Sequence, residues 1–186
     1  YSVALSVQPA AEDIITVYIV GGTNQAVTVT RHNSAVTVTG INLVIDALTV
    51  RSETATAITD ADLDAAQDGT ETDITDIYAD GATLTTPAGI DLIVETGDTF
   101  APTGTVVVGG DAFMKGTLTG ASTLTIAGDM SVTATGTYTA GGATTVGDDF
   151  SNLGTYTAGV TTLSVAGDFT NDAAATFTAG TGLVEF

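Results

Sequence analysis

The segment at 151–180, SNLGTYTAGVTTLSVAGDFTNDAAATFTAG, contains two copies of one pattern. Thr-Tyr-Thr-Ala-Gly at 155–159 returns as Thr-Phe-Thr-Ala-Gly at 176–180, and Gly-Asp-Phe at 167–169 lies between them. Successive side chains of a β-strand point to opposite faces, so Thr-Tyr-Thr places its ring on one face and both hydroxyls on the other. The pattern therefore predicts short strands that each bury one large side chain.

Gly-Asp pairs extend this repeat over the C-terminal part of the chain. They stand at 110–111, 128–129, 147–148 and 167–168, so their spacings are 18, 19 and 20 residues. A fixed period of this size indicates one supersecondary unit that buries its apolar face by stacking on its neighbours. We therefore expect an all-β fold, a β-solenoid (parallel β-helix) with short coils of 18–20 residues. A β-sandwich is the alternative, but it does not predict regular ladders.

Stacked coils place equivalent residues in columns. One inward column is predicted to contain Leu118, Tyr138, Tyr156 and Phe177, and a second to contain Phe113, Met130, Phe150 and Phe169. The Gly-Asp pairs are expected to form the turns, because Gly adopts backbone conformations that other residues avoid and Asp hydrogen-bonds nearby N–H groups. Their carboxylates would also stack, at Asp111, Asp129, Asp148 and Asp168. Like charges one coil apart repel unless a cation or backbone donors compensate, and we favour the turn role.

The pattern is looser upstream. Residues 1–83 are interpreted as an irregular β-rich N-terminal part with an acidic loop at 52–80, and residues 84–186 as the solenoid repeats. We expect one continuous elongated domain, with a separate N-terminal sandwich as the alternative. Ala-Val-Thr-Val-Thr occurs at 26–30 and again at 35–39, which predicts either a hairpin or two sides of an irregular coil. His32, between them, is expected to be an exposed turn residue.

The charge of the chain is strongly one-sided. Three basic residues stand against 22 acidic ones, for a formal net charge of −19. Such a surface repels nucleic acid and anionic membranes and attracts cations, and it keeps a β protein soluble. The apolar stretch at 14–20 is too short to cross a bilayer as a helix, so we expect no membrane insertion. Cysteine is absent, which does not settle the compartment.

One acidic cluster resembles the ligand spacing of an EF-hand calcium loop. Its acids stand at positions 1, 3, 5, 9 and 12 of the loop, as Asp60, Asp62, Asp64, Asp68 and Glu71. The resemblance fails at Ala65, where that loop needs Gly for its sharp turn. A solvated acidic loop, or a short helix capped by Thr59 or Asp60, explains the cluster without a metal. Calcium at these five residues is the one cofactor that the sequence suggests.

Catalytic signatures are weak. The chain has one histidine, no Gly-x-Ser-x-Gly elbow and no phosphate-binding glycine loop. Some parallel β-helices cleave acidic polysaccharides, but an anionic polymer would meet a strongly negative surface. Lys115, near Asp111, is the only basic residue inside the repeats. We therefore expect a protein that is not an enzyme, and we keep a β-helix polysaccharide-active enzyme as an alternative.

Residues 104–186 resemble the Gly-Asp-Phe-Thr-Asn…Gly-Thr-Phe-Thr-Ala-Gly-Thr β-helical repeats of large secreted and surface-attached prokaryotic proteins. The resemblance covers a little under half of the chain and rests on a compositional repeat. It implies an extracellular or cell-surface location and a structural or adhesive role, with contact to a cell surface or glycan. It names no specific partner.

The strand-like stretch at 1–7 and the final Leu-Val-Glu-Phe at 183–186 suggest two solenoid ends without polar caps. Uncapped ends invite head-to-tail stacking of identical copies, which generates a fibre. We therefore expect a self-assembling subunit of an extracellular filament or surface layer, with strand exchange by residues 1–8. The alternative is one segment of a larger β-helical adhesin. Outward Thr-x-Thr pairs also resemble those of ice-binding solenoids, although the variable loop lengths speak against ice binding.

Overall fold

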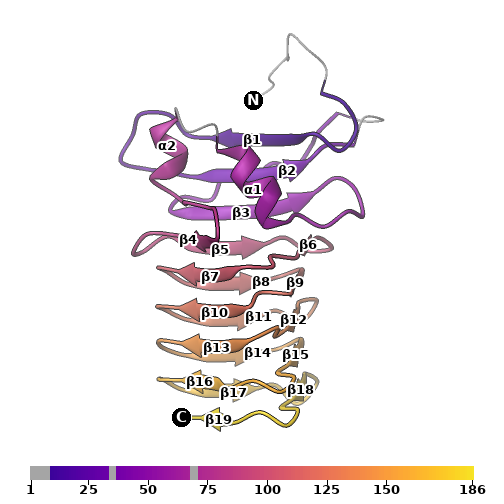
Figure 1. The fold of residues 1–186 in the computed structure, drawn as a ribbon, viewed down its shortest axis with the longest axis vertical. Helices are drawn as coiled ribbons and strands as arrows, with labels where there is room; N and C mark the ends of the chain where they lie inside the picture. Colours follow the sequence, from indigo (N-terminus) through magenta and orange to yellow (C-terminus); the bar gives the residue numbers. More distant parts are fainter. Residues whose placement is uncertain (1–8, 34–36, 68–70) are drawn as a thin grey trace.

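The protein is a β-solenoid, as the repeat predicts (Figure 1). The computed structural model describes residues 9–33, 37–67 and 71–186. Short strands follow one another around each coil, and each coil lies beneath the one before it, so that the chain descends from its N-terminal part to its C-terminus (Figure 1). One hydrophobic core extends from Val27 to Val165 through the interior of the stack.

Three sheets form the faces of the solenoid. Sheet A has the order β1 (Ile14–Tyr18), β2 (Val27–Arg31), β3 (Ala47–Ser52), β5 (Asp91–Val94), β8 (Ala112–Met114), β11 (Met130–Val132), β14 (Phe150–Asn152) and β17 (Phe169–Asn171). Sheet B consists of β6 (Thr99–Phe100), β9 (Thr117–Thr119), β12 (Thr137–Thr139), β15 (Thr155–Thr157) and β18 (Thr176–Thr178). Sheet C consists of β4 (Thr83–Thr85), β7 (Thr105–Val108), β10 (Thr123–Ile126), β13 (Ala143–Val146), β16 (Leu163–Val165) and β19 (Val184–Glu185).

The first predicted column is confirmed. Tyr138 pairs with Leu118 on one side and with Tyr156 on the other, and Tyr156 pairs with Phe177. The rings of Tyr156 and Phe177 stack with centroids 5.0 Å apart and planes 7° from parallel. Phe100 continues the column upward as the partner of Leu118. Identical strand register thus keeps one large side chain per coil in the core.

The second predicted column is wrong at its first member. Met130, Phe150 and Phe169 do pair in register, but the partner of Met130 in the coil above is Ala112. Phe113 lies at the outward position opposite Ser131 and is half-buried. The distance from Gly-Asp to the inward residue is not constant along the chain, so a large side chain soon after the pair is not by itself a sign of burial.

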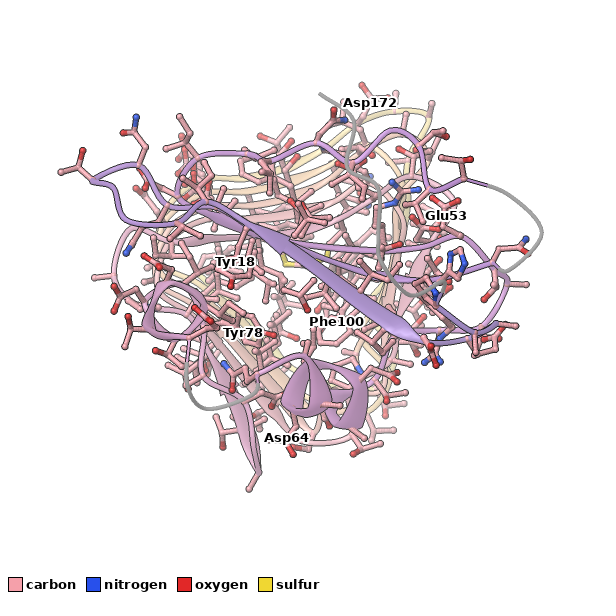
Figure 2. The ribbon with its side chains drawn as sticks, turned by 90° about the horizontal axis from the view of Figure 1, so that it is seen from above. Tyr18, Glu53, Asp64, Tyr78, Phe100 and Asp172 are labelled. Atoms are coloured by element: carbon pink, nitrogen blue, oxygen red, sulfur yellow. The ribbon has the colours of Figure 1, made fainter. Side chains whose placement is uncertain are left out.

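The N-terminal end departs from the parallel stack. β1 runs antiparallel to β2 and crosses above the interior, where Ile14 and Tyr18 pack against the core (Figure 2). β2 and β3 then continue sheet A in parallel register. The helices α1 (Asp60–Ala66) and α2 (Thr72–Thr75) lie beside these upper coils (Figure 1). Within the described residues, this end is therefore covered, contrary to the expectation of two open ends.

The predicted pairing of 26–30 with 35–39 is not observed. β2 takes β1 and β3 as its neighbours, and residues 37–39 have no regular structure, while 34–36 lie outside the described residues. His32 is buried, with 2% of its surface exposed, rather than an exposed turn residue. Part of the outer face of β2 is also buried, because the loop around Asn42 covers it, and Asn42 O accepts a hydrogen bond from Thr28 Oγ1 at 2.7 Å.

The C-terminal end of the described structure is open. β17, β18 and β19 are the last strands of the three sheets. Phe169 and Phe177 are only half-buried there, whereas Phe150 and Tyr156 in the coil above are fully buried. Phe186 packs its ring on Phe169 at 5.3 Å and remains 76% exposed.

Candidate functional site

The acidic stretch that resembles a calcium loop is mostly helical. Thr59 is the N-cap of α1, and its backbone N–H donates to Asp62 Oδ2 at 2.8 Å, which is half of a capping box. Asp60 and Asp62 both lie in the first turn, where negative charge is stabilised by the helix dipole. The alternative of a short helix capped by Thr59 therefore matches the observed backbone, and an extended loop that wraps an ion does not.

The carboxylates of this helix dock it onto the solenoid. Asp60 Oδ2 accepts hydrogen bonds from Thr103 N at 2.7 Å, from Thr103 Oγ1 at 3.0 Å and from Gly104 N at 3.0 Å. Asp62 forms an ion pair with Arg31, whose side chain is 11% exposed. The two acids thus point toward different parts of the chain, one toward the loop before β7 and the other toward the end of β2.

A pocket of about 350 Å³ opens beside this helix. Asp60 and Asp64 line it together with Ala61, Gly81, Ala82, Thr103 and Gly104. Next to it, Asp80 accepts the backbone N–H of Gly81 through Oδ1 at 2.7 Å. Within the described residues, Asp80 Oδ2 and Asp60 Oδ1 are buried without a hydrogen-bond partner. Burial, reinforced by the charges of Asp60 and Asp64, raises the pKa of Asp80 to about 6 despite the opposing backbone hydrogen bond.

The remaining predicted ligands do not join this pocket. Glu71 is the N-cap residue of α2, and Asp68 lies outside the described residues. No three of the described carboxylates at 60–71 come within coordination distance of a common point. Calcium at this stretch therefore stays a prediction. Asp80, which is not among the five predicted ligands, lies beside the pocket instead.

A ladder of aspartates follows one corner of the solenoid. The carboxylate of each of the first four members accepts the backbone N–H of the equivalent aspartate one coil below, at 2.8, 2.9, 3.0 and 2.7 Å in turn. The members are Asp91, Asp111, Asp129, Asp149 and Asp168. The expected stacking of aspartates is thus observed, with backbone donors in the compensating role.

The ladder corrects the predicted member Asp148. Between the turn glycine and the inward residue, the third repeat contains Asp148 and Asp149, where the second contains Asp129 alone. The extra residue shifts the register, so Asp149 occupies the ladder position and Asp148 lies beside it. Oxygens of Asp129, Asp148 and Asp149 fall within 4.8 Å of one another, and all three residues are exposed. The Asp-Asp doublet in the sequence is the signal that could have revealed this insertion.

The few basic side chains are all engaged in ion pairs. Lys115 Nζ lies 3.2 Å from Glu95 Oε1 in the coil above, rather than beside Asp111 as the sequence suggested. Arg51 pairs with Glu53, and Arg31 pairs with Asp62. His32 has no hydrogen-bond partner for either ring nitrogen among the described residues. Arg51 also lines a pocket of about 180 Å³ together with Glu95 and Asp98.

No known family model matches the chain, and no curated protein sequence or solved structure shows significant similarity to it. In the part of the chain that the structure describes, neither helix has the length and apolar character needed to cross a membrane. The β-solenoid itself is compatible with a structural or adhesin-like repeat protein.

Proposed function

We propose that this protein is a structural subunit of an extracellular filament or surface layer, and that copies assemble head-to-tail through the open C-terminal coil. The observation that carries the proposal is the exposure of large apolar side chains in that coil. Leu183 is 57% exposed and Phe186 is 76% exposed, and the half-buried rings of Phe169 and Phe177 lie at the same end. Covering these groups with another layer of strands would remove apolar surface from water.

Backbone groups support the same assembly. β17, β18 and β19 each end a sheet and present an edge at which another strand can add. At the opposite end, β6 is bridged by Ile58 and β4 is bridged by Ala79, which leaves β1 as the outermost strand of sheet A. A contact between β17 of one copy and β1 of the next would extend sheet A across the junction. Such a contact is heterologous and generates a fibre.

In the alternative version of the assembly, residues 1–8 of one copy pair as a strand with the C-terminal coil of the next. These residues lie outside the described part of the chain. A variant lacking residues 1–8 distinguishes the two versions. Undiminished assembly supports end-on docking through β1, and loss of assembly supports strand exchange.

The first experiment compares oligomeric state at rising protein concentration by light scattering and negative-stain electron microscopy. Wild-type protein is expected to form filaments. Phe186→Asp replaces the exposed ring of the last coil by a carboxylate and should prevent assembly. Val160→Asp is the matched control, because Val160 is 81% exposed and lies in a side loop between β15 and β16. Filaments formed equally by both variants would contradict end-on docking.

Salt provides a second readout. Copies that each carry a formal charge of −19 repel one another, and at 0.1 M salt that repulsion is screened over about 10 Å. We therefore expect assembly to increase with sodium chloride concentration. A wild-type protein that stays monomeric at every salt and protein concentration would favour the alternative, a segment of a larger β-helical adhesin. The proposal assigns no catalytic role, so release of reducing ends from a glycan panel would contradict it.

A further inference from the structure

The outward face of sheet B carries a regular array of threonines. β9, β12, β15 and β18 each present two, one on either side of the inward residue, and β6 adds one more. Strand register places them in two columns. The first contains Thr99, Thr117, Thr137, Thr155 and Thr176, and the second contains Thr119, Thr139, Thr157 and Thr178.

The array is regular in two directions. Neighbouring strands lie about 4.8 Å apart, and alternate residues of one strand lie about 6.7 Å apart. The sequence intervals between successive repeats vary, and that variation is the reason to doubt a regular face from the sequence alone. The differences in repeat length lie in the turns and not in the strands, because Thr137 pairs with Thr117 and with Thr155 without any offset. The strands of sheet B lie one beneath the other along the solenoid (Figure 1), and their register therefore repeats the threonine hydroxyls and methyl groups at even intervals.

The hydroxyls of this face are available to a ligand. Within the described residues, none of the nine makes a hydrogen bond with another protein group, and all nine side chains are at least partly exposed. Sheet C behaves differently, because Thr123 Oγ1 donates to Thr105 Oγ1 at 3.1 Å. The face is also uncharged: the outward positions of sheet B include none of the chain's 22 acidic residues.

The same strands are rigidly supported from inside. Leu118, Tyr138 and Tyr156 are fully buried directly behind the threonines, and the rings of Tyr138 and Tyr156 are 5.4 Å apart. A binding group that is already ordered loses little conformational entropy when it binds. The array is thus preorganised by the core of the solenoid.

These properties select the kind of ligand. A small molecule needs a concave pocket, which a sheet face of short side chains does not offer, and an ion needs charge. A sugar polymer would gain from aromatic rings for stacking, and no aromatic side chain lies outward on this face. A crystalline array of water offers evenly spaced hydrogen-bonding groups in two dimensions, and hydroxyls with methyl groups at fixed intervals match such an array through ordered water.

We propose that the threonine face of sheet B binds ice. The face lies on the side of the solenoid and not at its open end, so ice binding and end-to-end assembly do not compete for the same surface. The proposal does not depend on assembly.

The test measures thermal hysteresis and the incorporation of fluorescently labelled protein into growing ice. The double variant Thr137→Tyr with Thr155→Tyr places two rings in the centre of the array, and tyrosine is a favourable strand residue. The matched control is Thr125→Tyr with Thr145→Tyr, at exposed outward positions of sheet C. Circular dichroism melting of each variant shows whether the fold is kept.

We expect wild type and the sheet C variant to bind ice, and the sheet B variant to lose thermal hysteresis while keeping its melting temperature. Absence of ice binding by wild type overturns the proposal, and so does equal loss or equal retention in the two variants. Sedimentation with microcrystalline cellulose or chitin provides the remaining arm. Binding to either polymer, lost in the sheet B variant, together with no effect on ice, would assign the face to a polysaccharide instead.

Discussion

Two adjacent tyrosines of the aromatic column should respond in opposite directions to the same substitution. Tyr138 and Tyr156 are both fully buried, pair in register, and differ in what their hydroxyls contact. Tyr138 Oη bonds Thr144 Oγ1 at 2.7 Å. Tyr156 Oη is buried without a hydrogen bond of acceptable geometry. Burial raises the pKa of Tyr156 to about 12, and the nearby hydroxyl of Thr144 only partly opposes that shift.

The magnitude follows from the cost of unsatisfied buried groups. Tyr138→Phe removes one hydrogen bond and leaves Thr144, which is 1% exposed, with a buried hydroxyl, so it should lower the free energy of unfolding by about 1–2 kcal/mol. Tyr156→Phe removes a buried hydroxyl that has no partner and should raise the free energy of unfolding by up to about 1 kcal/mol. Both substitutions keep the ring, so no large cavity is formed.

Urea unfolding followed by circular dichroism measures the difference, and differential scanning calorimetry checks it. A gap of about 2 kcal/mol corresponds to about 4–8 °C in melting temperature for a chain of this size. In Tyr138→Phe, the hydroxyl of Thr144 can turn to that of Tyr156. If it does, the effects of the two single substitutions should not add, and the double variant tests this. Equal destabilisation by both single substitutions, or a larger loss for Tyr156→Phe, would refute the reasoning.

Other predictions concern packing, pH and the docking of α1. At Gly154 an added Cβ would lie 2.2 and 2.4 Å from backbone carbonyl oxygens, so Gly154→Ala should destabilise by about 2–3 kcal/mol in urea unfolding, whereas Gly81→Ala, with open space around it, should be nearly neutral. Burial raises the pKa of Asp80 in the folded protein from its ordinary value of 3.8 to about 6, so folding favours the protonated carboxyl. The stability that this protonation gives is complete below pH 3.8 and is lost as the pH rises to about 6. In thermal melts, Asp80→Asn should therefore stabilise the protein by about 1 kcal/mol at pH 7, after allowance for solvent screening, and leave its stability unchanged near pH 3. Asp62→Ala removes the closer of the two acids that pair with Arg31 and leaves only the half-exposed Glu12, at 3.7 Å, so it should cost about 1–3 kcal/mol, with a smaller loss in the double variant with Arg31→Met.

The repeat predicts the solenoid because its signal is local and recurs. Thr-Tyr-Thr and Thr-Phe-Thr alternate with period 2 in successive units, so the inward position is readable from the sequence and was confirmed at Tyr138, Tyr156 and Phe177. The same method failed at Phe113. There the prediction followed side-chain size, whereas the inward position belongs to Ala112, which directly follows Asp111 as the inward Met130 follows Asp129.

The site region was harder to predict because it depends on contacts between distant segments. The spacing of the carboxylates at 60–64 suggests a calcium ligand set. In the structure, however, Asp62 forms an ion pair with Arg31, and Asp60 accepts hydrogen bonds from the loop at 103–104. Neither partner is visible from the spacing of the acids. The N-cap signal at Thr59 was present in the sequence and agrees with the helix.

By itself the sequence determined the class of fold, the inward aromatic column and the acidic character of the surface, because each depends on residue type and on periodicity along the chain. Only the tertiary structure decided the strand that covers the N-terminal end, the aspartates that stack, and the even spacing of the threonine face. Those features depend on which residues become neighbours after each turn, and the insertion or loss of one residue in a turn changes that register without altering the repeat that precedes or follows it.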